Sequence, residues 1–195
     1  MDLPQIDTAC PRCADSSPGG QVCGACLSMV PHYDTTVALW HYEFPIDRLI
    51  HALKYDERLA LAAWFGRTLA QKQKHQAPDL LLPMPLHPRR LRERGFNQAG
   101  EIARTLSKHL RLPWQSDALL RIRDTAPQTD LPVAERGRNV KDAFVCMADL
   151  SGKTIAVIDD VMTTGATLNE TAAALKNAGA ARVENWVVAR AVLNS

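Results

Sequence analysis

The segment Thr154–Leu168 decides the fold and reads Thr-Ile-Ala-Val-Ile-Asp-Asp-Val-Met-Thr-Thr-Gly-Ala-Thr-Leu. Residues 155–158 form an unbroken apolar run rather than an alternating one. Such a run is typical of a strand buried on both faces of a parallel sheet. Two adjacent carboxylates, Asp159 and Asp160, follow at the carboxyl end of this predicted strand, and a loop of small and hydroxyl residues comes next.

A helix is predicted directly after this loop. Thr167 and Glu170 have the spacing of a capping box, so we expect a helix to begin at Thr167 and to stop at Gly179. Small side chains let backbone N–H groups approach an anion, and the helix dipole favours a phosphate there. The carboxylates would repel a phosphate unless they face sugar hydroxyls, with a divalent cation nearby. The alternative is that the two acids only favour a nearby helix N-terminus.

Composition indicates a globular protein with a real core. The chain has 195 residues, of which 46% are hydrophobic and 23% charged, enough for one domain and a small appendage. The acidic N-terminus lacks an apolar signal region, and no apolar run has the roughly 18 residues that a membrane span needs. We therefore expect a cytoplasmic protein without membrane insertion.

Charge is unevenly distributed along the chain. The net charge is +2, but residues 87–141 hold 12 Lys and Arg against 6 Asp and Glu. This excess makes a polyanionic partner or substrate plausible, although solvated helix faces account for some of it.

Four cysteines near the N-terminus have the spacing of a zinc site. Cys10 and Cys13 form one CxxC pair, and Cys23 and Cys26 form the other. Two such pairs can close a tetrahedral thiolate site, which leaves no open position and therefore indicates a structural role. Two disulfides or a redox pair are the alternatives, but the expected cytoplasmic location argues against disulfides. We expect residues 1–32 to form a zinc ribbon.

The remaining periodicity alternates between strand and helix patterns. Strands are expected at 35–43, 79–82, 119–123, 143–145 and 183–188, and helices at 46–53, 59–69 and 96–110.

The segment 87–98 is the most basic part of the chain. It places four guanidinium groups within six residues: Arg89, Arg90, Arg92 and Arg94. Guanidinium groups bind phosphates through paired donors, so a pyrophosphate and a nucleic-acid backbone suit them equally. A purely structural cluster is the third possibility. Phe96 either stacks on a base or covers the core.

These motifs together resemble the ComF family, the competence-protein-F-like proteins of bacteria. The residues that carry the resemblance are the two CxxC pairs, Leu53-Lys54-Tyr55, Pro85-Leu86, Arg94-Gly95-Phe96-Asn97-Gln98, Gln128, Arg138-Asn139, Phe144 and the loop after Asp159-Asp160. The resemblance implies a zinc ribbon at 1–32 joined to an α/β type I phosphoribosyltransferase fold at 33–195, with a parallel sheet flanked by helices.

The resemblance also implies a ligand, 5-phosphoribosyl-1-pyrophosphate (PRPP), bound with Mg²⁺. In type I phosphoribosyltransferases the acid pair holds the ribose hydroxyls and the following loop wraps the 5′-phosphate. The PRPP-binding residues would be Asp159, Asp160, Thr163, Thr164, Gly165, Ala166 and Thr167. The pyrophosphate would meet Pro85, Leu86, Arg89, Arg90 and Arg94. The nucleic-acid candidates are Arg92, Phe96, Arg136 and Arg138.

Two functional hypotheses remain open at this point. Members of the family are linked with DNA uptake, which implies single-stranded DNA and an uptake helicase as partners. Alternatively, the protein is an active phosphoribosyltransferase with an unidentified acceptor. Purine-salvage enzymes place an acidic base where this chain has Thr163, so that reaction is not expected. Asp56-Glu57 departs from the family pattern and leaves the role of Lys54 open.

Overall fold

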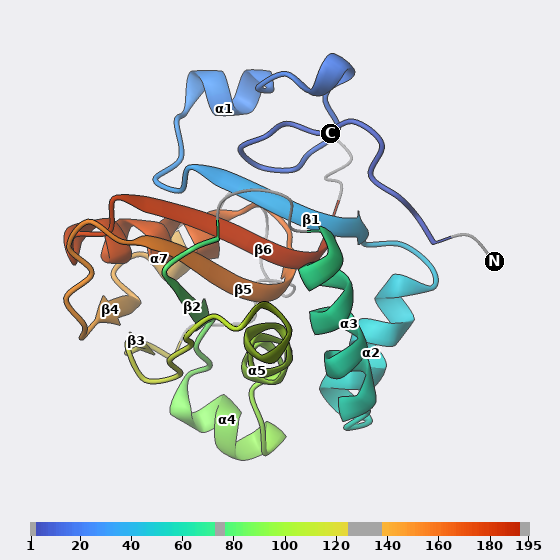
Figure 1. Ribbon diagram of the computed structural model, residues 1–195, viewed down its shortest axis with the longest axis vertical. Coiled ribbons are helices and arrows are strands. Elements are labelled where there is room, and N and C mark those ends of the chain that lie inside the picture. Colours follow the sequence, from blue (N-terminus) through green and yellow to red (C-terminus); the bar gives the residue numbers. More distant parts are fainter. Residues whose placement is uncertain (1–2, 73–76, 125–137, 192–195) are drawn as a thin grey trace.

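A four-stranded parallel sheet forms the centre of the computed structural model, which describes residues 3–72, 77–124 and 138–191. The strand order is β1-β6-β5-β2, and all three neighbouring pairs are parallel (Figure 1). The strands are β1 (Thr35–His41), β2 (Leu80–Pro83), β5 (Thr154–Met162) and β6 (Arg182–Arg190). The predicted buried strand at 155–158 is therefore confirmed as part of β5.

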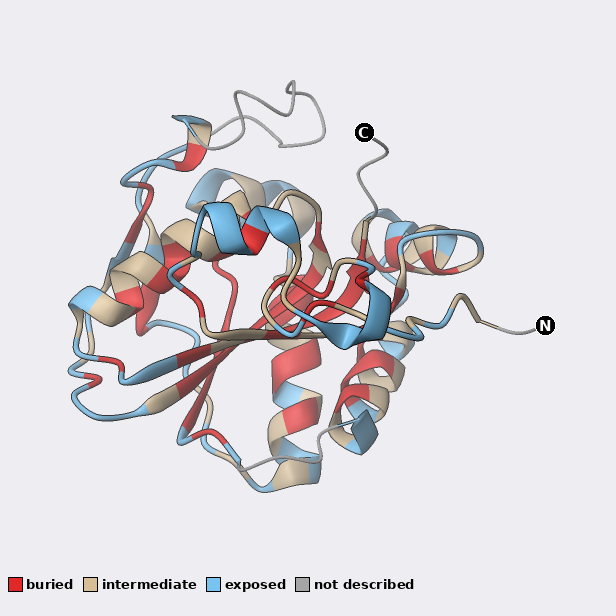
Figure 2. Ribbon diagram, turned by 90° about the horizontal axis from the view of Figure 1, so that it is seen from above, coloured by how far each residue is buried: buried red, intermediate tan, exposed pale blue. Residues whose placement is uncertain are grey.

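Helices cover both faces of this sheet. Those packed on it are α2 (Ile46–Tyr55), α3 (Leu59–Lys72), α5 (Gln98–Leu110) and α7 (Ala166–Asn177). Two shorter helices, α1 (Gly24–Ser28) in the N-terminal segment and α4 (Pro88–Arg94) before α5, lie outside these layers (Figure 1). Along β5, Ala156 and Ile158 join the buried cluster of α2, α3 and α5, whereas Ile155 and Val157 join the cluster that contains α7. Figure 2 shows the buried residues on the strands and on the helix faces turned toward them. This alternation explains why the sequence run has no polar position.

Helices α3 and α5 approach each other closely on their face of the sheet. A Cβ atom on Gly66 would lie 2.8 Å from the carbonyl oxygen of Ile102 and 2.8 Å from Cβ of Thr105. A side chain at Gly66 would therefore push the two helices apart.

A second, two-stranded antiparallel sheet consists of β3 (Leu119–Arg121) and β4 (Phe144–Cys146). It is separate from the main sheet and lies below α7 in the view of Figure 1. Its two strands are far apart in sequence, and their pairing brings Arg121 opposite Phe144. The expected strands at 119–123 and 143–145 are present, each shifted or shortened by one or two residues.

Two details of the segment that decides the fold differ from the sequence-based expectation. Strand β5 continues through both aspartates to Met162, so they lie within the strand near its carboxyl end rather than after it. Helix α7 begins at Ala166, and its N-cap is Gly165, not Thr167. The predicted capping box is wrong because the side chain of Glu170 instead accepts a hydrogen bond of 2.7 Å from the amide of Asp142.

The N-terminal segment lies along the edge of the sheet at β1, above it in Figure 1. It forms isolated bridges at Gln5–Trp40 and Ala9–Ser16, and its cysteines belong to the same buried cluster as α7. The division into domains at 1–32 and 33–195 stays a prediction. Among the described residues, no helix has the length and apolar character needed to cross a bilayer.

Candidate ligand pocket and metal site

A cavity of about 230 Å³ opens at the carboxyl ends of β2 and β5. Ligands of open α/β sheets characteristically bind at this edge, where loops and helix N-termini converge. The cavity is lined by residues from α2, the turn after β2, α4, α5, β3, β5 and the loop before α7. Segments more than 100 residues apart in sequence therefore meet around one space.

The acid pair forms the floor of this cavity. Asp159 and Asp160 are both buried, and the Asp160 amide donates a hydrogen bond of 2.8 Å to Oδ1 of Asp159. Burial and the neighbouring charge of Asp160 raise the pKa of Asp159 well above its ordinary value. The two carboxyls therefore have different protonation preferences, as expected for acids that share a buried site.

Lys54 on α2 is the counter-charge of this pair. Its Nζ forms an ion pair with Oδ2 of Asp160, and the side chain is 22% exposed. Burial alone would raise the pKa of Asp160, but the Lys54 charge reverses this and lowers it. Burial alone would lower the pKa of Lys54, but the carboxylates outweigh burial and raise it. Sequence reasoning left the role of Lys54 open, and the structure places it at the acid pair.

The segment Gly95-Phe96-Asn97-Gln98 connects α4 to the pocket. The Asn97 side chain caps α5 by accepting from the amides of Ala99 (3.0 Å) and Gly100 (3.3 Å), and it donates to the carbonyl of Met84 (3.0 Å). This single amide fixes both the start of α5 and the proline-containing turn after β2. Pro85 and Leu86 of that turn line the cavity, and their contact with a pyrophosphate stays a prediction.

Gln98 connects an arginine to the acid pair. Its Oε1 accepts a hydrogen bond of 2.6 Å from Arg94, and its side chain, after the larger effect of Lys54, helps to lower the pKa of Asp160. The guanidinium of Arg94 lies 5.5 Å from the ring centroid of Tyr55, at the end of α2. Tyr55 and Tyr42 also line the cavity, and sequence reasoning did not identify either as a pocket residue.

The loop after β5 closes one side of the cavity. Thr163, Gly165 and Thr167 line it, whereas Thr164 and Ala166 do not belong to its lining. Thr164 supports the loop from within, because its hydroxyl accepts a hydrogen bond of 3.3 Å from the Ala166 amide. Gly165 has a φ of 80°, a left-handed conformation that favours glycine. The N-terminus of α7 therefore points its positive end toward the cavity.

The arginines of the basic segment divide into two groups. Arg90 and Arg94 line the cavity. Arg89 is exposed and pairs with Glu93 (3.0 Å) and Asp124 (3.4 Å), and Arg92 is exposed on α4. Both Arg89 and Arg92 are absent from the cavity lining.

Arg121 is a cavity-lining arginine that sequence reasoning missed. It reaches the site because β3 pairs with β4 beside the pocket. Burial, together with repulsion from Arg90, lowers the pKa of Arg121. Two guanidinium groups close enough to repel each other form a region of positive potential that an anion would stabilise.

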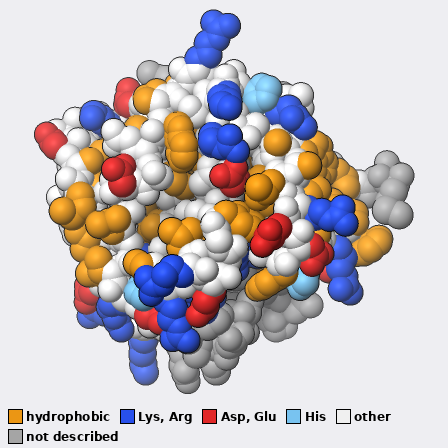
Figure 3. All heavy atoms as spheres, turned by 90° about the horizontal axis from the view of Figure 1, so that it is seen from below, with side chains coloured by type: hydrophobic (Ala, Val, Ile, Leu, Met, Phe, Trp, Pro, Cys, Tyr) orange, Lys and Arg blue, Asp and Glu red, His pale blue; other side chains and the backbone are white. Residues whose placement is uncertain are grey.

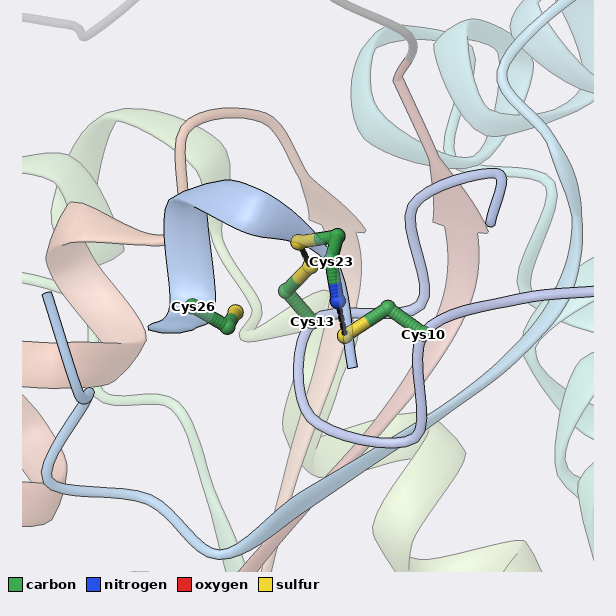
Figure 4. Close-up of side chains that lie close together, drawn as sticks. All are labelled: Cys10, Cys13, Cys23 and Cys26. Carbon is green, nitrogen blue, oxygen red and sulfur yellow. Dashed lines mark hydrogen bonds between the residues drawn. The ribbon is translucent and has the colours of Figure 1, made fainter. Parts of the chain in front are cut away.

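The four N-terminal cysteines meet at one point (Figure 4). Their Sγ atoms all lie within 4.8 Å of one another, and Sγ of Cys13 lies 3.6 Å from Sγ of Cys23. This spacing fits a tetrahedral ion with metal–sulfur bonds of about 2.3 Å. The four thiolates could hold a metal ion such as zinc, with a structural role because all four positions are filled by protein.

Backbone donors favour a thiolate within this cluster. Burial alone would raise the pKa of Cys10, but backbone N–H donors, including that of Cys23 at 3.3 Å, lower it to about 7. Burial raises the pKa of Cys13 to about 11. An N–H group that donates to a ligand sulfur is the kind of outer contact that orients the ligands of a metal.

Comparison with known proteins identifies the chain. The family described as "Phosphoribosyl transferase domain" matches residues 93–192. "DNA utilization protein YhgH" of Escherichia coli (strain K12) is 36% identical over 191 residues, with 94% of this chain and 84% of that protein covered. "Competence protein F" of Haemophilus influenzae is 34% identical over 185 residues, with 88% and 79% covered. The chain belongs to the ComF family.

The fold of this ComF chain is that of a type I phosphoribosyltransferase, with a parallel sheet flanked by helices. The glutamine PRPP amidotransferase of Bacillus subtilis has a TM-score of 0.46 and 19% identity, with 65% of this chain and 25% of that chain covered. A likeness of this size carries no functional information.

The predicted nucleic-acid residues of the ComF chain are dispersed. Phe96 is half-buried and packs against the core cluster of α3 and α5, whereas Arg138 is exposed. Arg136 and Gln128 lie outside the described residues. On the face seen in Figure 3, Lys and Arg side chains are interspersed with acidic and hydrophobic ones. That face therefore carries several small basic groups, not one continuous basic surface.

Proposed function

We propose that this ComF-family protein binds PRPP in the cavity at the end of β5 and acts in DNA uptake on the cytoplasmic side of the membrane. One observation carries the proposal of PRPP binding. The cavity combines a buried acid pair, several arginines and the N-terminus of a helix in one space of about 230 Å³. A ligand with a sugar diol and two separate phosphate groups complements these three features.

Each part of the ligand has a chemical counterpart in the cavity. Asp159 and Asp160 would accept hydrogen bonds from the ribose hydroxyls, and the loop 163–167 would bind the 5′-phosphate. Arg90, Arg94 and Arg121 would contact the pyrophosphate through charge-assisted hydrogen bonds. Mg²⁺ favours phosphate and carboxylate oxygens and would neutralise part of the pyrophosphate charge.

Calorimetric titration with PRPP and Mg²⁺ tests this assignment. We expect D159N/D160N to weaken PRPP binding at least tenfold, because both proposed diol acceptors lose their charge. D117N is the matched control, since Asp117 is exposed and is not part of the cavity lining. Unchanged affinity in D159N/D160N would contradict the assignment.

The proposal of DNA handling rests on the relatives and on the charge distribution. Two relatives carry the names "DNA utilization protein YhgH" and "Competence protein F". Arg92 and Arg138 are exposed and could contact backbone phosphates of single-stranded DNA. Tyr55 is exposed, with Arg94 over its ring, and could contact a base more readily than the half-buried Phe96. An uptake helicase is the proposed protein partner.

Fluorescence anisotropy of a labelled single-stranded oligonucleotide across a salt series tests DNA binding. Each lost phosphate contact should reduce the salt slope by about 0.7. We therefore expect R92Q/R138Q to flatten the slope by about 1.4, and Y55A to weaken binding with little change of slope. R182Q is the control, because Arg182 pairs with Glu184 at the far end of β6. A slope that is identical in R92Q/R138Q and the parent would exclude these contacts.

Catalysis of phosphoribosyl transfer is the second candidate function. The observation that favours it is the pair of adjacent pocket guanidiniums, Arg90 and Arg121, because a departing pyrophosphate needs charge stabilisation. A pyrophosphate-release screen with nucleobases and amines as acceptors would detect the reaction. Release that depends on an acceptor and is lost in R121Q would support it, and no release with any acceptor would leave binding as the function of the pocket.

A further inference from the structure

One arginine joins the cysteine cluster to the loop of the cavity. Arg190 is the last residue of β6, and it is only 3% exposed. On one side, its Nε donates to the carbonyl of Cys13 (2.9 Å), and its terminal nitrogen lies 3.2 Å from the Asp15 carboxylate. On the other side, it donates to the carbonyls of Met162 (3.3 Å) and Thr163.

These contacts fix the N-terminal segment that carries the four cysteines (the cysteine segment) relative to the loop 163–167 after β5. A buried guanidinium is tolerated only when its charge is paired and its donors are satisfied. Here the charge is paired by Asp15 from the cysteine segment, while donors are satisfied by carbonyls of both segments. Displacement of either segment would leave a buried donor or charge uncompensated, at a large energetic cost. The loop that begins at Thr163 is therefore supported by the segment that carries Cys13.

Two further contacts join the same regions. Tyr33 is buried in the same apolar cluster as Cys10, Cys13 and Cys26. Its hydroxyl lies 3.1 Å from the position that a Cβ atom on Gly165 would occupy. The amide of His32 donates a hydrogen bond of 2.7 Å to the Asn169 side chain in the first turn of α7. The cysteine segment and the residues that follow it, His32 and Tyr33, thus lie against the loop at Thr163 and Gly165 and against the first turn of α7.

We propose that Arg190 is a positioning residue that couples metal binding at the four cysteines to anion binding at the loop 163–167. A metal ion would hold the Cys13 carbonyl and Asp15 in place, and Arg190 would transmit this order to the Thr163 carbonyl. Loss of the metal would release these acceptors and loosen the loop. The inference rests on the proposed PRPP binding for its ligand-based test, but not for its structural test.

Coupling of this kind is reciprocal. If the metal strengthens PRPP binding by some factor, bound PRPP must strengthen metal binding by the same factor. Typical couplings change affinity 5- to 150-fold. We expect removal of zinc by a chelator to weaken PRPP binding at least fivefold. We also expect saturating PRPP with Mg²⁺ to slow zinc release to a colorimetric indicator.

The variants separate coupling from simple loss of structure. R190M removes the proposed connection, and D15N removes only the negative charge that pairs with Arg190 on the cysteine side, 3.2 Å away and outside the cavity lining. We expect D15N to fold, to bind PRPP more weakly and to lose most of the effect of PRPP on zinc release. R182M, at the opposite end of the same strand, is the control and should match the parent. Equal coupling in D15N, R190M and the parent would overturn the proposal.

Hydrogen exchange provides a readout that needs no ligand. In the zinc-loaded parent, we expect the peptide covering 162–168 to be protected, and chelation should increase its exchange rate. In R190M or D15N the peptide should exchange faster even with zinc present. If the parent fails to bind PRPP, the proposed function fails while this exchange test still decides the coupling. Loop exchange that does not respond to chelation would refute the coupling itself.

Discussion

Replacement of Lys54 by methionine should reveal how strongly the buried acid pair depends on its counter-charge. Methionine fills much of the volume of the lysine stem but leaves Asp160, with a side chain that is 5% exposed, without its cation. Removal of one partner of a buried ion pair typically costs about 3–5 kcal/mol. Asp160 can limit this cost by taking up a proton, since a buried carboxyl prefers its neutral form.

The free-energy cost of protonating Asp160 depends on pH. Keeping a carboxyl with an ordinary pKa of about 3.9 neutral costs about 5 kcal/mol at pH 7.5 but only about 2 kcal/mol at pH 5.5. In the parent protein the lowered pKa of Asp160 contributes stability above its unfolded pKa and loses it as the pH falls. K54M should therefore be destabilised by about 3–5 kcal/mol at pH 7.5 and by up to about 3 kcal/mol less at pH 5.5, since two pH units change the cost of protonation by about 2.7 kcal/mol.

Urea unfolding of the zinc-loaded protein measures this difference. Tryptophan fluorescence is a suitable probe because Trp40 and Trp64 stack at 5.1 Å between β1 and α3. R104M is the control, because Arg104 forms an exposed pair with Glu101 within α5 and should cost less than about 0.5 kcal/mol. A loss below 1 kcal/mol in K54M, equal at both pH values, would refute the idea that Lys54 keeps Asp160 ionised.

Three further substitutions test other parts of the structure. D159N should be more stable than the parent at neutral pH while binding PRPP more weakly. The raised pKa of Asp159 means that its ionised carboxylate destabilises the folded parent at neutral pH. The advantage of D159N in urea unfolding should therefore shrink as the pH falls toward 4 and Asp159 takes up a proton. G165A should destabilise the protein by about 1–2 kcal/mol in thermal unfolding, since Gly165 has a φ of 80° and an added Cβ would lie 2.6 Å from Cε of Met162. Equal PRPP affinity in G165A and the parent would contradict a role of this loop in PRPP binding. G66A should cost about 1–3 kcal/mol by forcing α3 from α5 without altering PRPP affinity in calorimetry, and an unchanged melting temperature would show that the helices separate freely.

Sequence reasoning worked best where one local pattern has one structural solution. The apolar run 155–158 predicted a strand buried on both faces, and β5 has that position. The two CxxC pairs likewise predicted a cluster whose four sulfurs do converge. Both signals depend on a few neighbouring residues and on chemistry that tolerates little variation.

Contacts between distant segments were not predictable in the same way. In the sequence, nothing distinguishes Lys54 from a surface lysine. Only the packing of α2 against the sheet places its ammonium group at Asp160. Arg121 enters the cavity because β3 pairs with β4, a strand more than 20 residues further along the chain. The capping box failed for a related reason, since a tertiary hydrogen bond to Asp142 engages Glu170 and the helix starts at the loop glycine. In each case a long-range contact decides between local options of similar energy.

The strand order has a consequence for how the chain folds during synthesis. Strand β6 ends at Arg190, yet it pairs with both β1 and β5 and therefore occupies an interior position of the sheet. Until β6 leaves the ribosome, β1 has no neighbour in the sheet, and the cysteine segment lacks the arginine that secures it. At about 5–20 residues per second, the roughly 150 residues between the ends of β1 and β6 take about 7–30 s. During that time β1 exposes an unpaired edge, a feature that favours association with other chains until β6 covers it.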